Sequence, residues 1–453
     1  MKFWALSAAL LPALLGSTAV MAQDDTHPFF GLGANGGVAV LKLPAGQNGV
    51  LTQGDVQGAG SDPLMIGGTF GFNGVIGIGK IGDYDAFMGA NLFATYANGS
   101  STRTQNFSGV GLVAIPGIST PANASIDLTT SRAAGAVASV NVVDNNPEGG
   151  NATNGFTQTT PAPGNQQSAS QVTAAGTGNS FVWGAANTQV SAGGVAKALA
   201  VGAAADTSGS LLLAVGDLDG LSIATSVQNS ILYTGMDVTF GASGVVNDRT
   251  VAQAYVGPSY RFIDQWNKTN YSLSVDLPEV AGTTVVHPLY TLDRNANVTS
   301  NYIGAVIGGS LASKVNDTVS VAFAAEGSLY YMHAALSGSD SVTIAGGSGV
   351  AGLPYGPQTV TYGPGASAFN NGIAYAIRGQ ASTTVNLNPN LDLTLAASVD
   401  YLSKVARPNG GANVTYTANA ADANANWSSS GSPLLSFGDM WAFTLTGGVS
   451  GHF

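Results

Sequence analysis

The stretch Phe437–Phe453, FGDMWAFTLTGGVSGHF, decides the fold class of this chain. From Trp441 to Phe453 its odd positions are apolar or glycine, and its even positions are small and mostly polar. A period of two over this length predicts a β-strand whose two faces lie in different environments. The stretch ends on an aromatic residue with no polar tail, whereas the terminal strand of a soluble protein usually frays into polar residues. A soluble β-sandwich could also end on such a strand.

The N-terminus has the features of a secretory signal peptide. Lys2 gives a short positive region, residues 3–15 are apolar, and Ala22 is a small residue just before the polar Gln23. The apolar run is too short for a membrane-spanning helix, so we expect residues 1–22 to be cleaved from an exported chain, residues 23–453. There is no cysteine, which excludes disulfides, thiolate metal sites and a lipid anchor on a processed cysteine.

The composition is that of a chain without a solvated surface. Charged residues make up 9%, against about 25% in typical soluble domains. Glycine is abundant, with 62 residues. A β-barrel in lipid needs an apolar outside and small, neutral polar residues inside, which fits this composition. The formal net charge of −11 argues against a nucleic-acid partner and against binding of anionic lipid through a basic patch.

Alternating runs along the chain predict ten strands joined by connections of alternating length. A strict alternation of short and long connections is typical of outer-membrane barrels, whereas the Greek-key links of a sandwich give no reason for it. A further hairpin in residues 188–215 would raise the count to twelve, although a helix over residues 195–205 is an alternative there. The short connections are 81–83, 244–248, 315–317 and 388–390, and the long ones are 43–63, 99–228, 264–299, 336–371 and 407–432.

In its signal peptide, its strands and its closing strand, the chain resembles the outer-membrane β-barrel proteins of Gram-negative bacteria. The resemblance implies an all-β fold: a transmembrane, antiparallel, up-and-down β-barrel of ten or twelve strands with short periplasmic turns and long extracellular loops. It also implies insertion by the barrel-assembly machinery, with Phe453 as the C-terminal signal. Residues 99–228 would be a long extracellular insertion, either a hydrated loop or a small irregular domain. Strands of roughly 14 residues exceed the ~9–11 that cross a bilayer, so the barrel should project beyond the lipid.

Aromatic residues gather near the outer ends of the expected strands, mostly on the apolar face. This placement predicts one girdle of interfacial aromatic side chains. Tyr233 and Tyr302 lie at the same height in the opposite phase, which indicates either a bulge or a misassigned phase. The predicted girdle residues are Tyr96, Tyr260, Phe262, Tyr331, Tyr375, Tyr401 and Trp441.

Charged residues of the opposite phase are predicted to point into the lumen. A buried charge must be paired or hydrated. If these residues pair they plug the barrel, and if water reaches them they line a narrow pore and set its selectivity. The lumen-lining candidates are Asp237, Arg261, Glu326, Arg378, Asp392, Asp400 and Lys404.

Other motifs give no chemistry. Two GxGxxG matches, in residues 31–36 and 77–82, lie in a strand and at a turn, whereas a dinucleotide site needs a following helix. Asp217-x-Asp219-Gly220 lacks the further ligands of a calcium loop. The four histidines show no metal-ligand spacing. We therefore predict no metal, no cofactor and no catalytic residue.

Two functions from different classes remain. One is a porin-like channel for passive diffusion of small hydrophilic solutes, and the other is a closed barrel whose long surface loops serve binding or adhesion. A hydrolase at the outer rim, built on His333, is a third alternative. The expected partners are outer-membrane lipid, the assembly machinery and, for a pore, small hydrophilic solutes; the oligomeric state stays open.

Overall fold

The computed structural model describes residues 30–44, 50–56, 64–132, 136–146, 150–159, 167–177, 180–190, 196–275, 290–344, 358–362, 368–388, 390–408, 412–419, 422–430 and 435–452. The expected signal peptide and Phe453 lie outside these ranges. The described fold is all-β, and it contains no helix long and apolar enough to cross a membrane.

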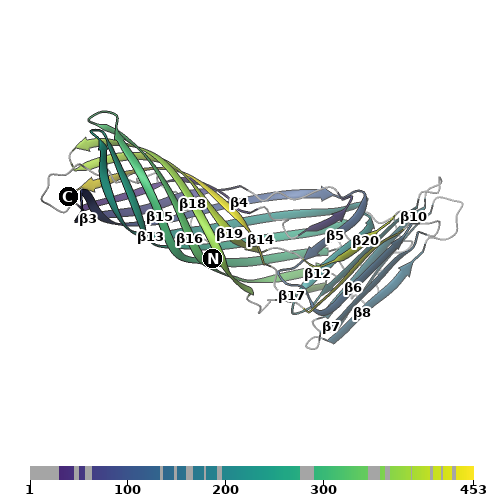
Figure 1. Cartoon of the computed structure of the whole chain (residues 1–453). Coiled ribbons are helices and arrows are strands. Elements are labelled where there is room, and N and C mark those ends of the chain that lie inside the picture. Colours follow the sequence, from purple (N-terminus) through teal and green to yellow (C-terminus); the bar gives the residue numbers. More distant parts are fainter. Residues whose placement is uncertain are drawn as a thin grey trace.

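Ten antiparallel strands form a closed ring (Figure 1). Their order around the ring is β15-β14-β13-β4-β3-β1-β22-β19-β18-β16, and β16 pairs back with β15. The first and last strands of the chain are neighbours, paired from Gly31 and His452 to Lys42 and Trp441. The ring strands are β1 (Phe30–Lys42), β3 (Met65–Ile81), β4 (Tyr84–Asn106), β13 (Leu221–Asn247), β14 (Thr250–Val275), β15 (Tyr290–Lys314), β16 (Val319–Ile344), β18 (Ala368–Asn388), β19 (Leu391–Pro408) and β22 (Leu435–His452).

The two ends of the ring differ in their connections. Four hairpins, β3–β4, β13–β14, β15–β16 and β18–β19, turn over a few residues at one end, which we call the turn end. All longer connections leave from the opposite end. There the strand β17 (Gln358–Tyr362) pairs with the C-terminal part of β16.

Strands β13 to β16 are much longer than expected. The 26 residues of β14 span about 85 Å at ~3.3 Å per residue. The predicted loop over residues 264–299 is therefore wrong, because β14 continues to Val275 and β15 begins at Tyr290. The predicted loop over 336–371 is likewise shorter, since β16 runs to Ile344. In these added segments most outward residues are polar, with Trp266 of β14 an exposed exception, so the strands lose the lipid-facing apolar pattern.

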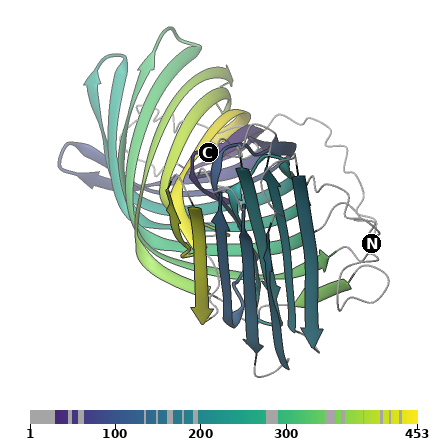
Figure 2. The same cartoon turned by 90° about the vertical axis from the view of Figure 1, so that its right-hand side faces the viewer.

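Two smaller sheets at the end opposite the turn end make up what we call the head (Figures 1 and 2). Most of their strands come from the predicted insertion, and the long connections before β3 and before β22 contribute the others. The six-stranded sheet consists of β2 (Leu51–Gly54), β5 (Val110–Pro116), β12 (Ser210–Asp217), β11 (Ala196–Ala205), β10 (Ser180–Val190) and β9 (Gln167–Thr177). The five-stranded sheet consists of β20 (Thr415–Ala418), β21 (Asp422–Ser430), β6 (Ala122–Ser131), β7 (Ala138–Asn146) and β8 (Gly150–Gln158).

The six-stranded sheet is the middle of three layers. On β12, Leu212 and Ala214 pack with Tyr271, Leu273 and other inner residues of the long ring strands. Leu211, Leu213 and Val215 pack against the five-stranded sheet. Burial of both faces explains the continuous apolar run of β12, which lacks alternation. A hairpin exists in this region, β11–β12, but it belongs to the head and not to the ring. Where a helix was the alternative, residues 196–205 form the strand β11.

Buried ionic side chains join the head to the ring. Asp340 of β16 accepts a hydrogen bond of 2.5 Å from the backbone N–H of Ile118, in the connection between β5 and β6. Arg294 lies opposite Asp340 on β15 and donates to the carbonyl of Pro116 at 3.5 Å. Because both side chains are almost fully buried, the head is fixed to the wall and is not a freely moving loop.

Candidate functional site: the interior of the barrel

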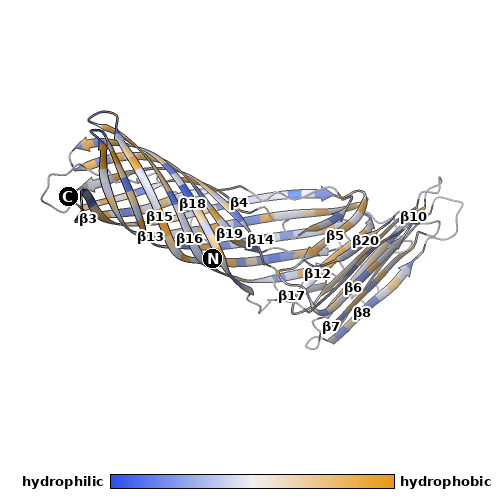
Figure 3. Cartoon of the chain, viewed as in Figure 1, coloured by the Kyte–Doolittle hydropathy of each residue, from blue (hydrophilic) through white to orange (hydrophobic). Residues whose placement is uncertain are grey.

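Large apolar residues occupy outward positions of the ring strands near the turn end. The ribbons there carry orange, hydrophobic bands in Figure 3. Ile307, Phe323 and Ile377 are more than half exposed, at 66%, 65% and 58%. On β4 the apolar face runs from Tyr84 to Tyr96, which at ~3.3 Å per residue and a tilt of ~45° gives a height of about 28 Å. This height matches the ~25 Å apolar band of outer-membrane barrels.

A layer of paired charges lies inside the ring. The guanidinium of Arg261 donates two hydrogen bonds to the carboxylate of Asp237, at 2.6 and 2.9 Å. These side chains are only 6% and 5% exposed. The hydroxyl of Ser259 donates to the same carboxylate at 2.6 Å and lies 2.8 Å from the hydroxyl of Tyr330. The carboxylate of this buried pair thus accepts three hydrogen bonds, which offset part of the cost of removing the charges from water.

The second half of the layer is a row on three consecutive strands. Glu326, Arg378 and Asp400 lie directly opposite one another on β16, β18 and β19. The Nε atom of Arg378 is 3.5 Å from Asp400, and the hydroxyl of Tyr255 donates to Glu326 at 2.7 Å. We call the two halves together the charged layer.

The ring of Phe93 connects the two halves. Its centroid lies 5.1 Å from the guanidinium carbon of Arg261 and 5.7 Å from that of Arg378. The negative face of an aromatic ring attracts such cations, and more strongly in a dry environment. The charged layer therefore reaches across the lumen instead of lining its wall.

Two glycines make room for these long side chains. Gly235 is the register partner of Phe93, and a Cβ atom there would lie 2.3 Å from the aromatic ring. Gly308 is the register partner of Tyr255, and a Cβ atom there would lie 2.7 Å from the tyrosine ring. Each aromatic side chain thus lies flat over a neighbouring strand, which is how a narrow barrel is filled.

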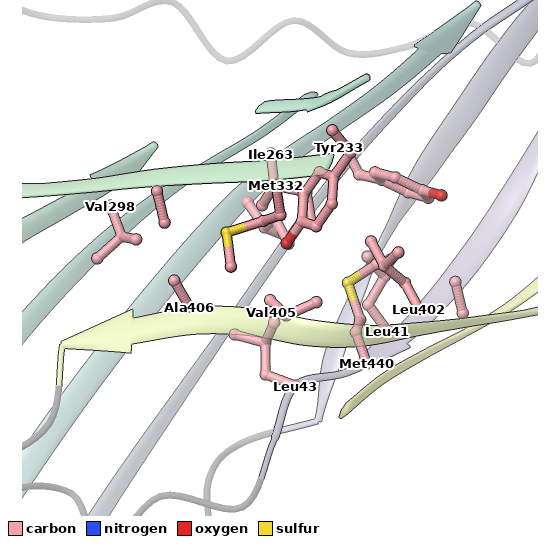
Figure 4. Close-up of a cluster of buried hydrophobic side chains, with 14 of the residues drawn as sticks. Leu41, Leu43, Tyr233, Ile263, Val298, Met332, Leu402, Val405, Ala406 and Met440 are labelled. Carbon is pink, nitrogen blue, oxygen red and sulfur yellow. The ribbon is translucent and has the colours of Figure 1, made fainter. Parts of the chain in front are cut away.

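Next to the charged layer, on the side of the head, is a set of buried apolar side chains that we call the apolar plug (Figure 4). Strand β19 bends toward it, and side chains of other strands bind the β19 backbone. The hydroxyl of Tyr302 donates to the carbonyl of Lys404 at 3.2 Å, and the amide of Gln265 donates to the carbonyl of Ala406 at 2.7 Å. The plug includes Leu41, Tyr233, Ile263, Tyr302, Met332, Leu402, Val405 and Met440, all at most 3% exposed.

The bend of β19 interrupts the wall pairing. The pairs between β18 and β19 end at Ala376 and Leu402. Beyond them β18 continues along β16 only and β19 along β22 only. Beyond that point the backbone N–H of Tyr375 on β18 donates to the hydroxyl of Ser403 on β19 at 2.8 Å. We call this interruption the β18–β19 seam.

Between the charged layer and the turn end is a cavity of about 160 Å³. Its walls come from seven ring strands, so it occupies the lumen itself. Asp237, Glu326 and Arg378 face it from the charged layer, and Asn73, Asn91 and Gln253 face it from the wall.

A closed antiparallel ring with an apolar belt outside and charges inside can satisfy its backbone in lipid. By architecture, the chain is an antiparallel β-barrel with an apolar outer belt. No protein-family model and no curated protein matches its sequence.

Solved structures show a weak likeness to this barrel. The crystal structure of the P. putida toluene transporter TodX covers 94% of this chain and 89% of its own at 9% identity, with a TM-score of 0.23. A TodX monoaromatic hydrocarbon channel, the deltaS2 mutant, covers 94% and 90% at 10% identity, with a TM-score of 0.22. The P pilus usher PapC translocation pore matches with a TM-score of 0.08. Scores this low support no argument about this chain, so its architecture is inferred from its own strand pairing.

The predicted girdle residues lie on the outer surface of the barrel, partly in contact with one another. The hydroxyls of Tyr375 and Tyr401 are 3.3 Å apart, and the rings of Tyr401 and Trp441 are 4.9 Å apart. Tyr96, Tyr331, Tyr375 and Trp441 are exposed, whereas Tyr260, Phe262 and Tyr401 are half-buried. Tyr233 and Tyr302 point inward, into the apolar plug, and the register of β13 and β15 shows no shift at either residue.

The seven predicted lumen residues have three different outcomes. Five of them, Asp237, Arg261, Glu326, Arg378 and Asp400, form the charged layer. Asp392 is buried further along β19, toward the turn end. Lys404 was predicted to belong with them and does not, because it lies at a register shift of β19, has a φ of 53° and is exposed. A bulge changes which face the following residues take.

Several residues of the charged layer were missed from the sequence. Phe93 has the phase of the inward Asn91 and Thr95, and Tyr255 has the phase of the inward Gln253. Both could have been found by asking which aromatic residues lie on the polar face. Tyr330 and Ser259 share the same inward phase as their neighbours, but nothing in the sequence indicates which partners they take.

The remaining motifs show ordinary structural contacts. His333 hydrogen-bonds the side chain of Asn371 at 2.7 Å. Asp217 accepts from Arg132 at 2.8 Å, and Asp219 pairs with Lys197 at 2.5 Å. The Lys197 ammonium lowers the pKa of the Asp219 carboxyl. Ammonium and guanidinium groups thus occupy the oxygens that a cation would need.

Proposed function

We propose that the barrel is closed to hydrophilic solutes and that its function is to present the head at the cell surface for binding. One observation carries this proposal. The core that joins the six-stranded sheet to the long ring strands is continuous and fully buried, with Leu212, Tyr271 and Tyr290 all at most 1% exposed. The barrel mouth is thus filled by packed structure, and the apolar plug and the charged layer follow beneath it.

The orientation is part of the same proposal. The apolar belt lies near the turn end, and the head lies beyond the opposite end. In outer-membrane barrels short turns face the periplasm and long connections face outward. The head would therefore stand outside the cell, residues 1–22 would direct export, and the exposed aromatic residues would meet the lipid headgroups.

The chemistry of the outermost sheet indicates what kind of partner it takes. Most of its outward residues are hydroxyls and amides in register across the strands, and Asn424, Thr129, Ser139 and Thr157 form one such row. The exposed Asp127 of β6 belongs to another row, with Asn426 and Asn141. A row of uncharged donors and acceptors recognises a polar, uncharged partner, such as a glycan, by hydrogen bonds. Binding through this face would depend little on salt.

Binding of the refolded protein to an array of neutral glycans, in low and high salt, tests the proposal. The matched variants are Thr129→Lys in the row and Lys268→Thr on the exposed side of β14. We expect salt-insensitive binding that Thr129→Lys removes and Lys268→Thr leaves unchanged. Steady ion conductance by the same preparation would contradict the closed barrel.

A second candidate function has an observation in its favour. The half of the lumen toward the head is apolar and rich in tyrosine and methionine, and it adjoins the β18–β19 seam. Such a lining suits a small apolar solute and does not suit a hydrophilic one. The lumen therefore argues against an open, porin-like diffusion channel. Toluene is a suitable probe of this class. Faster uptake by cells that produce the protein than by cells that lack it would support a gated apolar route; equal uptake would refute it.

A further inference from the structure

We propose that the head pairs edge to edge with the head of a second copy of this chain, through the strands β8 and β9. This inference goes beyond the glycan-binding function proposed above and does not depend on it.

The two sheets of the head end on one common side. β8 is the last strand of the five-stranded sheet, and β9 is the last strand of the six-stranded sheet. Among the described residues, β8 pairs with β7 alone and β9 pairs with β10 alone. The two strands lie against each other, so their outer edges form one surface. We call this surface the β8–β9 edge.

The β8–β9 edge lacks the features that usually protect the edge of a sheet. Edge strands are commonly short, charged, bulged or interrupted by proline, because their N–H and C=O groups otherwise pair with another chain. At their other ends the two sheets finish with β2 and β20, which have only four residues each. β8 has nine residues and β9 has eleven, with no charged residue, no proline and no register shift. The edge is therefore suited to pair with a further strand.

The sequence of β8, GNATNGFTQ, fits an antiparallel pairing with itself. A two-fold axis at Asn154 would place Asn151 opposite Thr157 on the outward face, an amide opposite a hydroxyl. On the inner face Ala152 would lie opposite Phe156, a small side chain opposite a large one. Phe156 is only half-buried in the single chain, and the second copy would cover more of it. The strand is thus self-complementary, as the interface of a two-fold dimer must be.

The size of the β8–β9 edge suits a weak dimer. The nine residues of β8 span about 30 Å at ~3.3 Å per residue, and two sheets packed ~10 Å apart make an edge roughly 20 Å thick. Each copy would bury about 600 Å² and the pair about 1,200 Å², the lower limit for specific interfaces. The net charge of −11 opposes pairing little here, because neither strand carries a charge. We expect a dissociation constant in the micromolar range.

Sedimentation equilibrium of the refolded full-length protein in density-matched detergent micelles tests the pairing. The variant is Thr153→Lys, because Thr153 is exposed on β8 and the two-fold pairing places the two copies of this position diagonally across from each other. Thr129→Lys is the control, since it adds the same charge to the same face on β6, two strands from the edge. A mixture of Thr153→Lys and Thr153→Glu proteins tests for direct contact between copies. Circular dichroism and migration of unheated samples on gels show whether each variant is folded.

We expect wild type and Thr129→Lys to dimerise equally. Thr153→Lys alone should dimerise at least about tenfold more weakly, because like charges then meet, and mixing it with Thr153→Glu should restore association. Wild type that stays monomeric at about 100 µM, far above the expected range, would overturn the proposal. So would a dimer that Thr153→Lys does not weaken, or a mixture of the two charged variants that stays monomeric. Glycan binding is a separate readout, because Thr129→Lys should remove it and leave the dimer intact.

Discussion

Removal of one charge of the Asp237–Arg261 pair should cost far more than removal of both. In Asp237→Leu the guanidinium stays buried without its carboxylate, and in Arg261→Met the carboxylate keeps only the Ser259 hydroxyl. A buried pair broken on one side loses about 3–5 kcal/mol. In the double variant neither charge is left, and the cost should fall below the sum of the single costs by at least ~2 kcal/mol. Loss of the Phe93 contact adds ~0.5–2 kcal/mol wherever Arg261 is absent.

Equilibrium unfolding of the refolded barrel in urea, followed by tryptophan fluorescence, measures these four free energies. Ser398→Ala, elsewhere in the lumen, controls for a general effect of interior changes. If each single variant costs less than ~1 kcal/mol and the costs add, the charges are hydrated as in an open pore. That result would refute the argument that the charged layer closes the lumen.

Three further changes test other parts of the structure. Gly308→Ala should destabilise the barrel by ~1–3 kcal/mol, because its Cβ would meet the Tyr255 ring. Gly327→Ala is the control and should not destabilise it, because a Cβ at that position meets nothing within 4 Å. Equal effects of the two variants on urea unfolding would contradict this prediction. Ile307→Arg on the outer belt should cost ~2–4 kcal/mol in a bilayer, and no cost there would show that the belt does not face lipid. Burial raises the pKa of the Asp206 carboxyl in the head, so its ionisation destabilises the fold as the pH rises through and above 3.8. Asp206→Asn should therefore be more stable than wild type at neutral pH and lose this advantage in acid. Thermal unfolding at several pH values measures the difference.

The parts of the fold that lie in lipid were predictable from the sequence. Strands such as β22 separate two environments, so Phe443 and Leu445 alternate with Thr444 and Thr446. This alternation shows which residues face lipid and which face the lumen. The head was not predictable in this way. Its middle sheet is buried on both faces, so Leu211–Leu213 show no period. Its outer sheet does alternate, as Ile126 and Leu128 do with Asp127 and Thr129 on β6, but over short strands that stand among many Ser, Thr and Asn residues.

The sequence predicted which charged side chains point into the lumen, but not which of them form ion pairs with one another. Asp237, Arg261 and Arg378 could be placed inside the barrel because inward and outward residues alternate. Which carboxylate each guanidinium takes depends on strand order and register across the ring. Lys404 was misplaced because a single shift in β19 changes the phase, and residues 402–405 give no sign of it. The lengths of β14 and β15 were missed because their outer residues become polar above the lipid.

Single-channel recording of the refolded protein in planar lipid bilayers tests the central claim most directly. The charged layer, the apolar plug and the packed head predict a silent barrel, with no steady conductance steps in simple salt solution. The variant Arg261→Met should be silent as well, because the plug and the head remain in place. Steady steps from wild type that change in size when Arg378 or Asp400 is neutralised would contradict the account and restore the open pore.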